Sequence, residues 1–140
     1  MPNRPFTQAL DQLRGAGLRP TRQRMALAKL LFEGPDRHVT AETLHAEAMA
    51  AQIRVSLATV YNTLHQFTGA KLLREVVVDS SRTYFDTNIS DHHHFFVENN
   101  GKLMDIDGEK IAITGLPEAP GGMGIARVDV IVRLAGDPEA

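Results

Sequence analysis

Apolar residues recur at helical spacing through the first third of the chain. The pattern predicts helices over residues 6–16 and 21–33, with Gly17 and Gly34 where glycine commonly ends a helix. A third helix, rich in alanine, is predicted after Thr40, a residue type favoured at N-caps. The N-terminal part of the protein is therefore expected to be helical.

A fourth predicted helix begins at Ser56 in "SLATVYNTLHQFTGA". Its buried stripe is expected to contain four apolar side chains: Leu57, Val60, Leu64 and Phe67. The opposite face is expected to carry Ser56, Thr59, Asn62, Thr63 and Gln66. That face is polar but uncharged, which is the chemistry that reads the edges of bases.

The hydrophobic period changes after Gly69, where the fourth helix is expected to stop. Two short strands, Leu72–Val78 and Arg82–Asp86, are predicted around a "DSS" turn. Beyond a polar "TNIS" hinge we expect a strand, an "NNG" turn, a strand, a short helix and a final half-buried strand over 126–134. Helices followed by a hairpin are the plan of a winged helix.

We therefore predict an α+β fold with two domains. Residues 1–86 would form a winged helix-turn-helix domain, 87–91 a hinge, and 92–140 a small α/β dimerisation domain. Because about fifty residues make a poor independent core, the second domain is expected to pair with a second copy.

Composition narrows the chemistry. The 140 residues include no cysteine, which excludes disulfides and thiolate ligands, so any metal must be held by nitrogen and oxygen. No run is long enough to span a membrane, and the N-terminus lacks a secretory pattern. We expect a cytoplasmic protein with no membrane partner.

Charge is distributed unevenly around a net value of −2. Residues 1–75 hold ten Lys/Arg and six Asp/Glu, a charge of +4, whereas residues 76–140 hold five and eleven, a charge of −6. A basic first half suits a polyanion, and an acidic, histidine-bearing second half suits cations.

Candidate DNA contacts lie at two places in the basic half. The fourth helix places small polar and aromatic side chains near its start, as a recognition helix requires, at Ser56, Thr59, Tyr61 and Asn62. The segment "LRPTRQR" places cations around a helix start, where they and the free backbone amides can meet phosphates, at Arg19, Arg22 and Arg24.

A run of three histidines begins the second domain. Side chains alternate along a strand, so His92 and His94 share one face and His93 lies on the other. The "NNG" hairpin returns Asp105 beside them. Nitrogen and oxygen ligands of this kind suit Zn(II), Fe(II) or Mn(II).

Five segments together resemble a known family. "GLRPTRQRMALAKLL", "HVTAETLH", "SLATVYNTLHQF", "RTYFD" and "HHHFFVENNGKLMDI" are similar, in order and spacing, to the ferric uptake regulator (Fur) family of metal-responsive winged-helix transcription regulators. The uninterrupted "HHH" and the absence of cysteine resemble its iron response regulator (Irr) branch, which senses iron through heme.

The resemblance implies a sensor site between the two domains, matched here by His38, Asp86, His92, His94 and Asp105. A second family site is incomplete, because Asp91 and His93 lack their later acidic and histidine partners. His93 is then available as an axial heme ligand, and heme, if bound, would use His92, His93 or His94.

The resulting hypothesis is a homodimeric, metal- or heme-responsive regulator of iron homeostasis genes that binds double-stranded operator DNA and is not an enzyme. A heme-delivery protein would be a further partner of the heme-sensing form. Two alternatives stay open: a metal or heme carrier without DNA binding, and a metal-dependent hydrolase that activates water at the His/Asp cluster.

Overall fold

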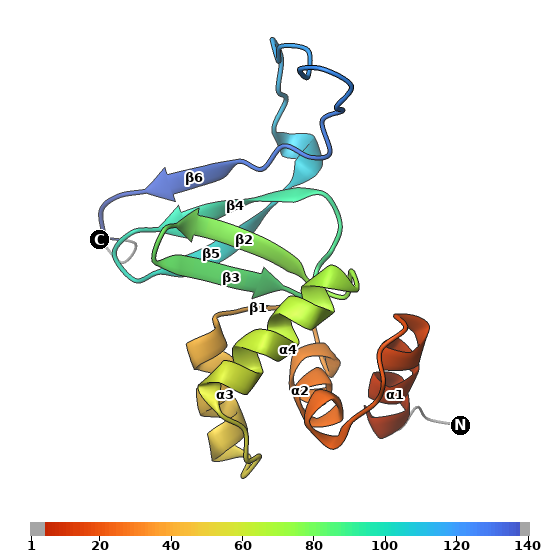
Figure 1. The fold of residues 1–140 in the computed structure, drawn as a ribbon. Coiled ribbons are helices and arrows are strands. Elements are labelled where there is room, and N and C mark those ends of the chain that lie inside the picture. Colours follow the sequence, from red (N-terminus) through yellow and green to blue (C-terminus); the bar gives the residue numbers. More distant parts are fainter. Residues whose placement is uncertain (1–4, 138–140) are drawn as a thin grey trace. The chain divides into compact units, whose positions relative to one another are not determined.

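The chain divides into two compact units in a computed structural model that describes residues 5–137 (Figure 1). Unit 1 ends at Ile89, and unit 2 begins at Ser90. Helices of eight or more residues occur in unit 1, whereas the described part of unit 2 is built from strands, one short 3-10 turn and loops. The predicted α+β fold is confirmed.

Unit 1 begins with helices, in the order α1 (Pro5–Gly15), α2 (Arg22–Phe32), α3 (Ala41–Ala50) and α4 (Leu57–Gly69). Local sequence sets where three of them start: the side chains of Thr21, Thr40 and Ser56 each accept a hydrogen bond from the backbone N–H three residues later. Gly17 and Gly34 have positive φ angles of 77° and 110°, as the predicted helix ends require.

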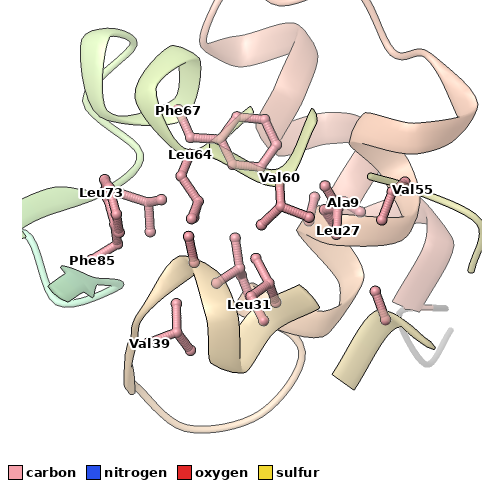
Figure 2. Packing of buried hydrophobic residues seen from close by; sticks show 14 of the residues in the cluster. Ala9, Leu27, Leu31, Val39, Val55, Val60, Leu64, Phe67, Leu73 and Phe85 are labelled. Carbon is pink, nitrogen blue, oxygen red and sulfur yellow. The ribbon is translucent and has the colours of Figure 1, made fainter. Parts of the chain in front are cut away.

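A three-stranded antiparallel sheet completes unit 1. Its strands β1 (His38–Val39), β2 (Arg74–Asp79) and β3 (Arg82–Asp86) lie in the order β1-β3-β2. Figure 2 shows the core, where Val60, Leu64 and Phe67 of α4 pack with apolar side chains from the other helices and from the sheet. Four helices followed by the β2–β3 hairpin are consistent with the predicted winged helix.

Three details of unit 1 differ from the prediction. Leu57 is 37% exposed and Thr63 is 5% exposed, the reverse of what was expected. Thr63 occupies the i+3 position of the buried i, i+3, i+4, i+7 stripe that begins at Val60. The helix ends at Gly69, as predicted, and Lys71, two residues later, has a positive φ of 65°. The next strand starts at Arg74 rather than Leu72.

Unit 2 contains a three-stranded sheet of order β5-β4-β6. The strands β4 (His92–Val97) and β5 (Lys102–Asp107) form the predicted hairpin, followed by the 3-10 turn η1 (Gly108–Lys110) and β6 (Ile131–Leu134). Strand β6 runs parallel to β4, which occupies the centre of the sheet. Phe96 is fully buried, and Val97, Leu103 and Ile106 are also buried.

Two elements of unit 2 are shorter than predicted. The expected short helix is only the single turn η1, and the final strand covers Ile131–Leu134 rather than 126–134. Residues 111–130 form neither helix nor strand, and β6 pairs with only four residues of β4, from His94 to Val97. None of the helices in the described ranges is long and apolar enough to cross a membrane.

Candidate nucleic-acid interface and metal ligands

The N-terminal turn of α4 is fixed by its cap. Ser56 Oγ accepts the Thr59 backbone N–H at 3.0 Å, and its own hydroxyl donates to Thr59 Oγ1 at 3.0 Å. Both side chains were predicted to contact DNA, and here each has a partner inside the protein. The cap leaves the other amides of the first turn to point outward, as at any helix start.

Arg24 joins the start of α2 to α4. Its guanidinium donates twice to Gln66 Oε1, from Nε at 3.2 Å and from Nη2 at 3.0 Å, and once to the Arg19 carbonyl at 2.9 Å. Arg24 is therefore oriented by the protein, whereas the side chains of Arg19 and Arg22 are exposed. A groove of about 400 Å³ lies here, lined in part by Arg19, Arg24, Asn62 and Gln66.

Tyr61, another predicted DNA contact, is held by α3. Its hydroxyl donates to Glu42 Oε1 at 2.6 Å, and its ring stacks on His65 with the centroids 6.5 Å apart. The hydrogen bond from Tyr61 lowers the pKa of the Glu42 carboxyl and raises the pKa of the Tyr61 phenol. The pair consequently keeps its hydrogen bond across the neutral range.

Unit 1 contributes two of the predicted metal ligands. His38 of β1 and Asp86 of β3 are direct partners in the antiparallel register, and Nε2 of the histidine lies 3.3 Å from Asp86 Oδ2. The other oxygen, Asp86 Oδ1, accepts the Asn88 backbone N–H at 2.8 Å, which fixes the carboxylate. Sheet pairing therefore brings together two residues that are 48 positions apart in the sequence.

Unit 2 contains the other three predicted metal ligands. The Nε2 atoms of His92 and His94 each lie 3.4 Å from Asp105 Oδ1, and the three residues offer ligand atoms within 4.8 Å of one another. His94 is the cross-strand partner of Asp105 in the β4–β5 register. His92, His94 and Asp105 therefore lie on one face of the sheet, as predicted.

The tautomer of His92 suits metal binding. Its Nδ1 lies 2.6 Å from the Ser90 carbonyl oxygen, and because a carbonyl only accepts, Nδ1 carries the proton. The lone pair of Nε2 then faces a carboxylate oxygen, an arrangement that a cation between them would stabilise. Metal-ligating histidines commonly donate their second nitrogen to a carbonyl in this way. The donor set therefore fits a divalent ion.

His93 has the opposite tautomer. Its Nδ1 accepts the Val130 backbone N–H at 3.1 Å, so in the neutral ring the proton is on Nε2. The side chain is 8% exposed and borders a separate hollow of about 530 Å³ with Asp91, Asp107 and Glu109. His93 thus connects β4 to the segment before β6. It is not part of the cluster of possible metal ligands that contains His92 and His94.

Sequence reasoning missed two partners of the predicted residues. Glu42 lies 19 positions from Tyr61, and Gln66 lies 42 positions from Arg24. No local pattern signals either pair. The sequence signals only that Gln66 lies on the polar face of its helix.

A helical unit with a polar exposed helix face, joined to a sheet unit that carries imidazole and carboxylate ligands, defines a metal-binding protein with the element order of a DNA-binding regulator. Residues 15–124 match the model of the ferric uptake regulator family. The chain belongs to this family, which consists of transcription regulators.

Individual relatives support the assignment. The peroxide operon regulator of Bacillus subtilis is 35% identical over 98 residues, covering 70% of this chain and 67% of that protein. The Pseudomonas aeruginosa ferric uptake regulator, solved with manganese, has a TM-score of 0.69 and 25% identity and covers 91% of this chain and 97% of that one. The Vibrio cholerae ferric uptake regulator has a TM-score of 0.70 at 20% identity, with coverages of 91% and 99%, and shows the likeness of fold.

Proposed function

We propose that this chain is a homodimeric, metal-responsive transcription regulator that binds operator DNA and controls iron homeostasis genes. Unit 1 would act as a winged helix, with α4 in the major groove and the exposed Arg19 and Arg22 on phosphates. The observation that carries the proposal is the outer face of α4, which is polar, uncharged and bordered by cations.

We further propose that the ligands of both units bind one divalent ion, Zn(II), Fe(II) or Mn(II). Support comes from the donor types of the two partial sets, His38 with Asp86 and the three ligands of unit 2. An ion held by both units would restrict their relative orientation and hence the separation of the two recognition helices in a dimer. The coupling is limited by the ion's differential affinity for the two arrangements.

Self-association is supported by unit 2. Its small core is accompanied by a segment without helix or strand whose apolar side chains are exposed at Ile113, Leu116, Met123 and Ile125. A second copy would remove this surface from water, which is favourable in proportion to its apolar area. A two-fold dimer also presents two recognition helices to an inverted-repeat operator.

The chemical signal has two candidates besides the metal itself. The relative from B. subtilis is named as a peroxide regulator, and this favours peroxide as a second candidate. Fe(II) at the site would be oxidised by hydrogen peroxide, whereas Zn(II) has no redox chemistry. Peroxide should therefore release operator DNA from the iron-loaded protein and leave the zinc-loaded protein bound.

Heme is the other candidate signal, suggested by the resemblance to the Irr branch. An axial bond through His93 Nε2 would need that nitrogen's lone pair, which conflicts with the hydrogen bond that Nδ1 accepts. Heme would accordingly compete with the anchoring of Val130. A Soret band that persists unchanged when His92, His93 and His94 are all replaced by alanine would contradict heme binding by this strand.

A mobility-shift experiment tests the proposed function. The full chain is used to select from a randomised duplex library, first with Mn(II) or Zn(II) and then with a chelator. We expect enrichment of a palindromic sequence and a shift that the chelator weakens. No sequence-specific shift under any metal or heme condition would contradict the proposal.

A further inference from the structure

Some polar side chains on the exposed side of α4 already make hydrogen bonds within the described part of the chain, and others do not. Ser56 and Thr59 bond to each other, and Tyr61 donates its hydroxyl proton to Glu42. Thr63 is buried. A group that must exchange an internal hydrogen bond for one to a base gains less from the base, because the internal bond is lost.

Arg24 and Gln66 form a pair, called here the Arg24–Gln66 clamp, that limits the hydrogen bonds Gln66 can make to a base. Oε1 receives two N–H groups from Arg24, which use both of its lone pairs. Its amide nitrogen can still donate, but the side chain lacks the acceptor that the exocyclic amine of adenine requires. Gln66 therefore cannot make the two-bond contact to adenine without releasing Arg24.

The side chain of Asn62, in contrast, is not engaged by the described part of the protein. It is exposed, and its amide makes no hydrogen bond to any residue in the described range 5–137. At 100° per residue it lies on the side of α4 opposite the buried Val60, Leu64 and Phe67. Ala58, one turn earlier, is also exposed and is small enough for a base edge to approach closely.

The amide of Asn62 keeps both a donor and an acceptor. Adenine presents an acceptor at N7 and a donor at N6 in the major groove, and asparagine matches this pair with two hydrogen bonds. We propose that Asn62 is the residue through which α4 reads one adenine in each operator half-site, while the Arg24–Gln66 clamp positions the helix. This inference rests on the proposed function, in which α4 enters the major groove.

The test replaces single adenines of the operator. The full chain, loaded with Mn(II), is first used to select its operator from a randomised duplex library. Each adenine of a half-site is then replaced in turn by 7-deazaadenine, which pairs normally but lacks N7. For the unchanged protein we expect one position at which replacement weakens binding roughly 5- to 100-fold. For Asn62→Ala the same replacement should have almost no effect.

A second variant gives a readout that loss of binding alone cannot give. In Asn62→Asp the donor is replaced by a carboxylate, which accepts from the amine of cytosine. Repeating the selection with this variant should change the preferred base at that one position from adenine to cytosine. The matched control is Asn99→Ala, an exposed asparagine of unit 2, for which the preferred bases should not change.

Two outcomes would overturn the inference and can be told apart. If the unchanged protein binds its operator specifically but every 7-deazaadenine weakens Asn62→Ala as much as the unchanged protein, Asn62 does not read adenine and the proposed function stands. If the unchanged protein selects no sequence at all, the proposed function and the inference both fail.

Discussion

Asp105 is the one carboxylate among the three predicted ligands of unit 2. Its Oδ1 is shared by Nε2 of His92 and Nε2 of His94, each at 3.4 Å, so one carboxylate serves both imidazoles. The ring of His92 is already oriented by the Ser90 carbonyl. A preorganised set of this kind binds an ion without first having to order its side chains.

Replacement of this carboxylate should weaken metal binding. For Asp105→Asn we expect the affinity for Mn(II) or Zn(II) to fall at least roughly 10-fold, because the negative ligand is lost. Competition with a chromophoric chelator measures the change. Asp107→Asn is the matched control, since Asp107 is also on β5 and caps η1 through an oxygen that asparagine retains. Equal metal affinities for the two variants would exclude Asp105 as a ligand.

The bond between Glu42 and Tyr61 makes a pH-dependent contribution. The pKa of Glu42 is lowered from 4.5, so its contribution to stability is present above pH 4.5 and is lost as the pH falls through the folded-state pKa. The pKa of Tyr61 is raised from 10.0, so its contribution is present below pH 10.0 and is lost as the pH rises through the folded-state value.

Replacement of Glu42 therefore has a spectroscopic consequence. In Glu42→Gln the pKa of Tyr61 should fall toward its ordinary value of 10.0, because the charged acceptor is gone. Phenolate absorbance followed against pH measures this, and Tyr61→Phe identifies which titration belongs to Tyr61 and which to Tyr84. An unchanged titration of Tyr61 in Glu42→Gln would show that the bond is absent in solution.

Among the strands, β6 is held in place by its neighbour β4. It is a four-residue edge strand whose approach is fixed by two bonds of Val130: its N–H donates to His93 Nδ1, and its carbonyl accepts the His94 N–H at 3.1 Å. Short edge strands have few ladder bonds of their own. The histidine run therefore has a structural role, through His93, in addition to the metal-binding role proposed for His92 and His94.

Removal of the His93 acceptor should loosen this strand. His93→Ala removes the acceptor of the half-buried Val130 N–H, and a hydrogen bond of this kind contributes about 0.5–1.5 kcal/mol. Hydrogen exchange of the amides of Val130 and of residues 131–134 should become faster. In His93→Asn the side-chain oxygen can take the place of Nδ1, and protection should be largely retained. Exchange at Val130 that is as slow in His93→Ala as in the unchanged protein would contradict this role.

Elements defined by local chemistry were predictable from the sequence. The helix starts follow from Thr21, Thr40 and Ser56, and two helix ends follow from Gly17 and Gly34. The hairpin of unit 2 follows from alternation and the "NNG" turn. The final strand was predicted too long, because alternation marks a half-buried segment but does not reveal how many residues of the partner strand are available for pairing.

From the residues alone, the site was predictable where geometry is local; the pairing of His38 with Asp86 was expected only from the family resemblance. Strand alternation separates His93 from His92 and His94, and this separation is found in the structure. The engagement of Tyr61 by Glu42 and of Arg24 by Gln66 depends on how helices pack, which no spacing in the sequence encodes. Those contacts alter what each predicted DNA residue can still offer to a base.

At the scale of the whole molecule, the proposed function couples two parts of the chain that have opposite charge. The basic residues 1–75, at +4, contain the proposed DNA face, and the acidic residues 76–140, at −6, contain four of the five proposed ligands. Under the proposed function a metal ion bound by both units is an effector of DNA binding. Coupling of this kind is reciprocal, because operator DNA must strengthen metal binding by the same factor, taken over both ions of the dimer.

The most direct measurement is therefore a closed thermodynamic cycle. The affinity of the full chain for its selected operator is measured with saturating Mn(II) and with chelator, and its affinity for Mn(II) is measured with and without operator. We expect the operator affinity to rise about 5- to 150-fold with Mn(II). The Mn(II)-affinity ratios of the two sites of the dimer should multiply to the same factor, and all of these ratios should fall toward one in Asp105→Asn. An operator affinity that Mn(II) leaves unchanged would contradict metal-responsive DNA binding.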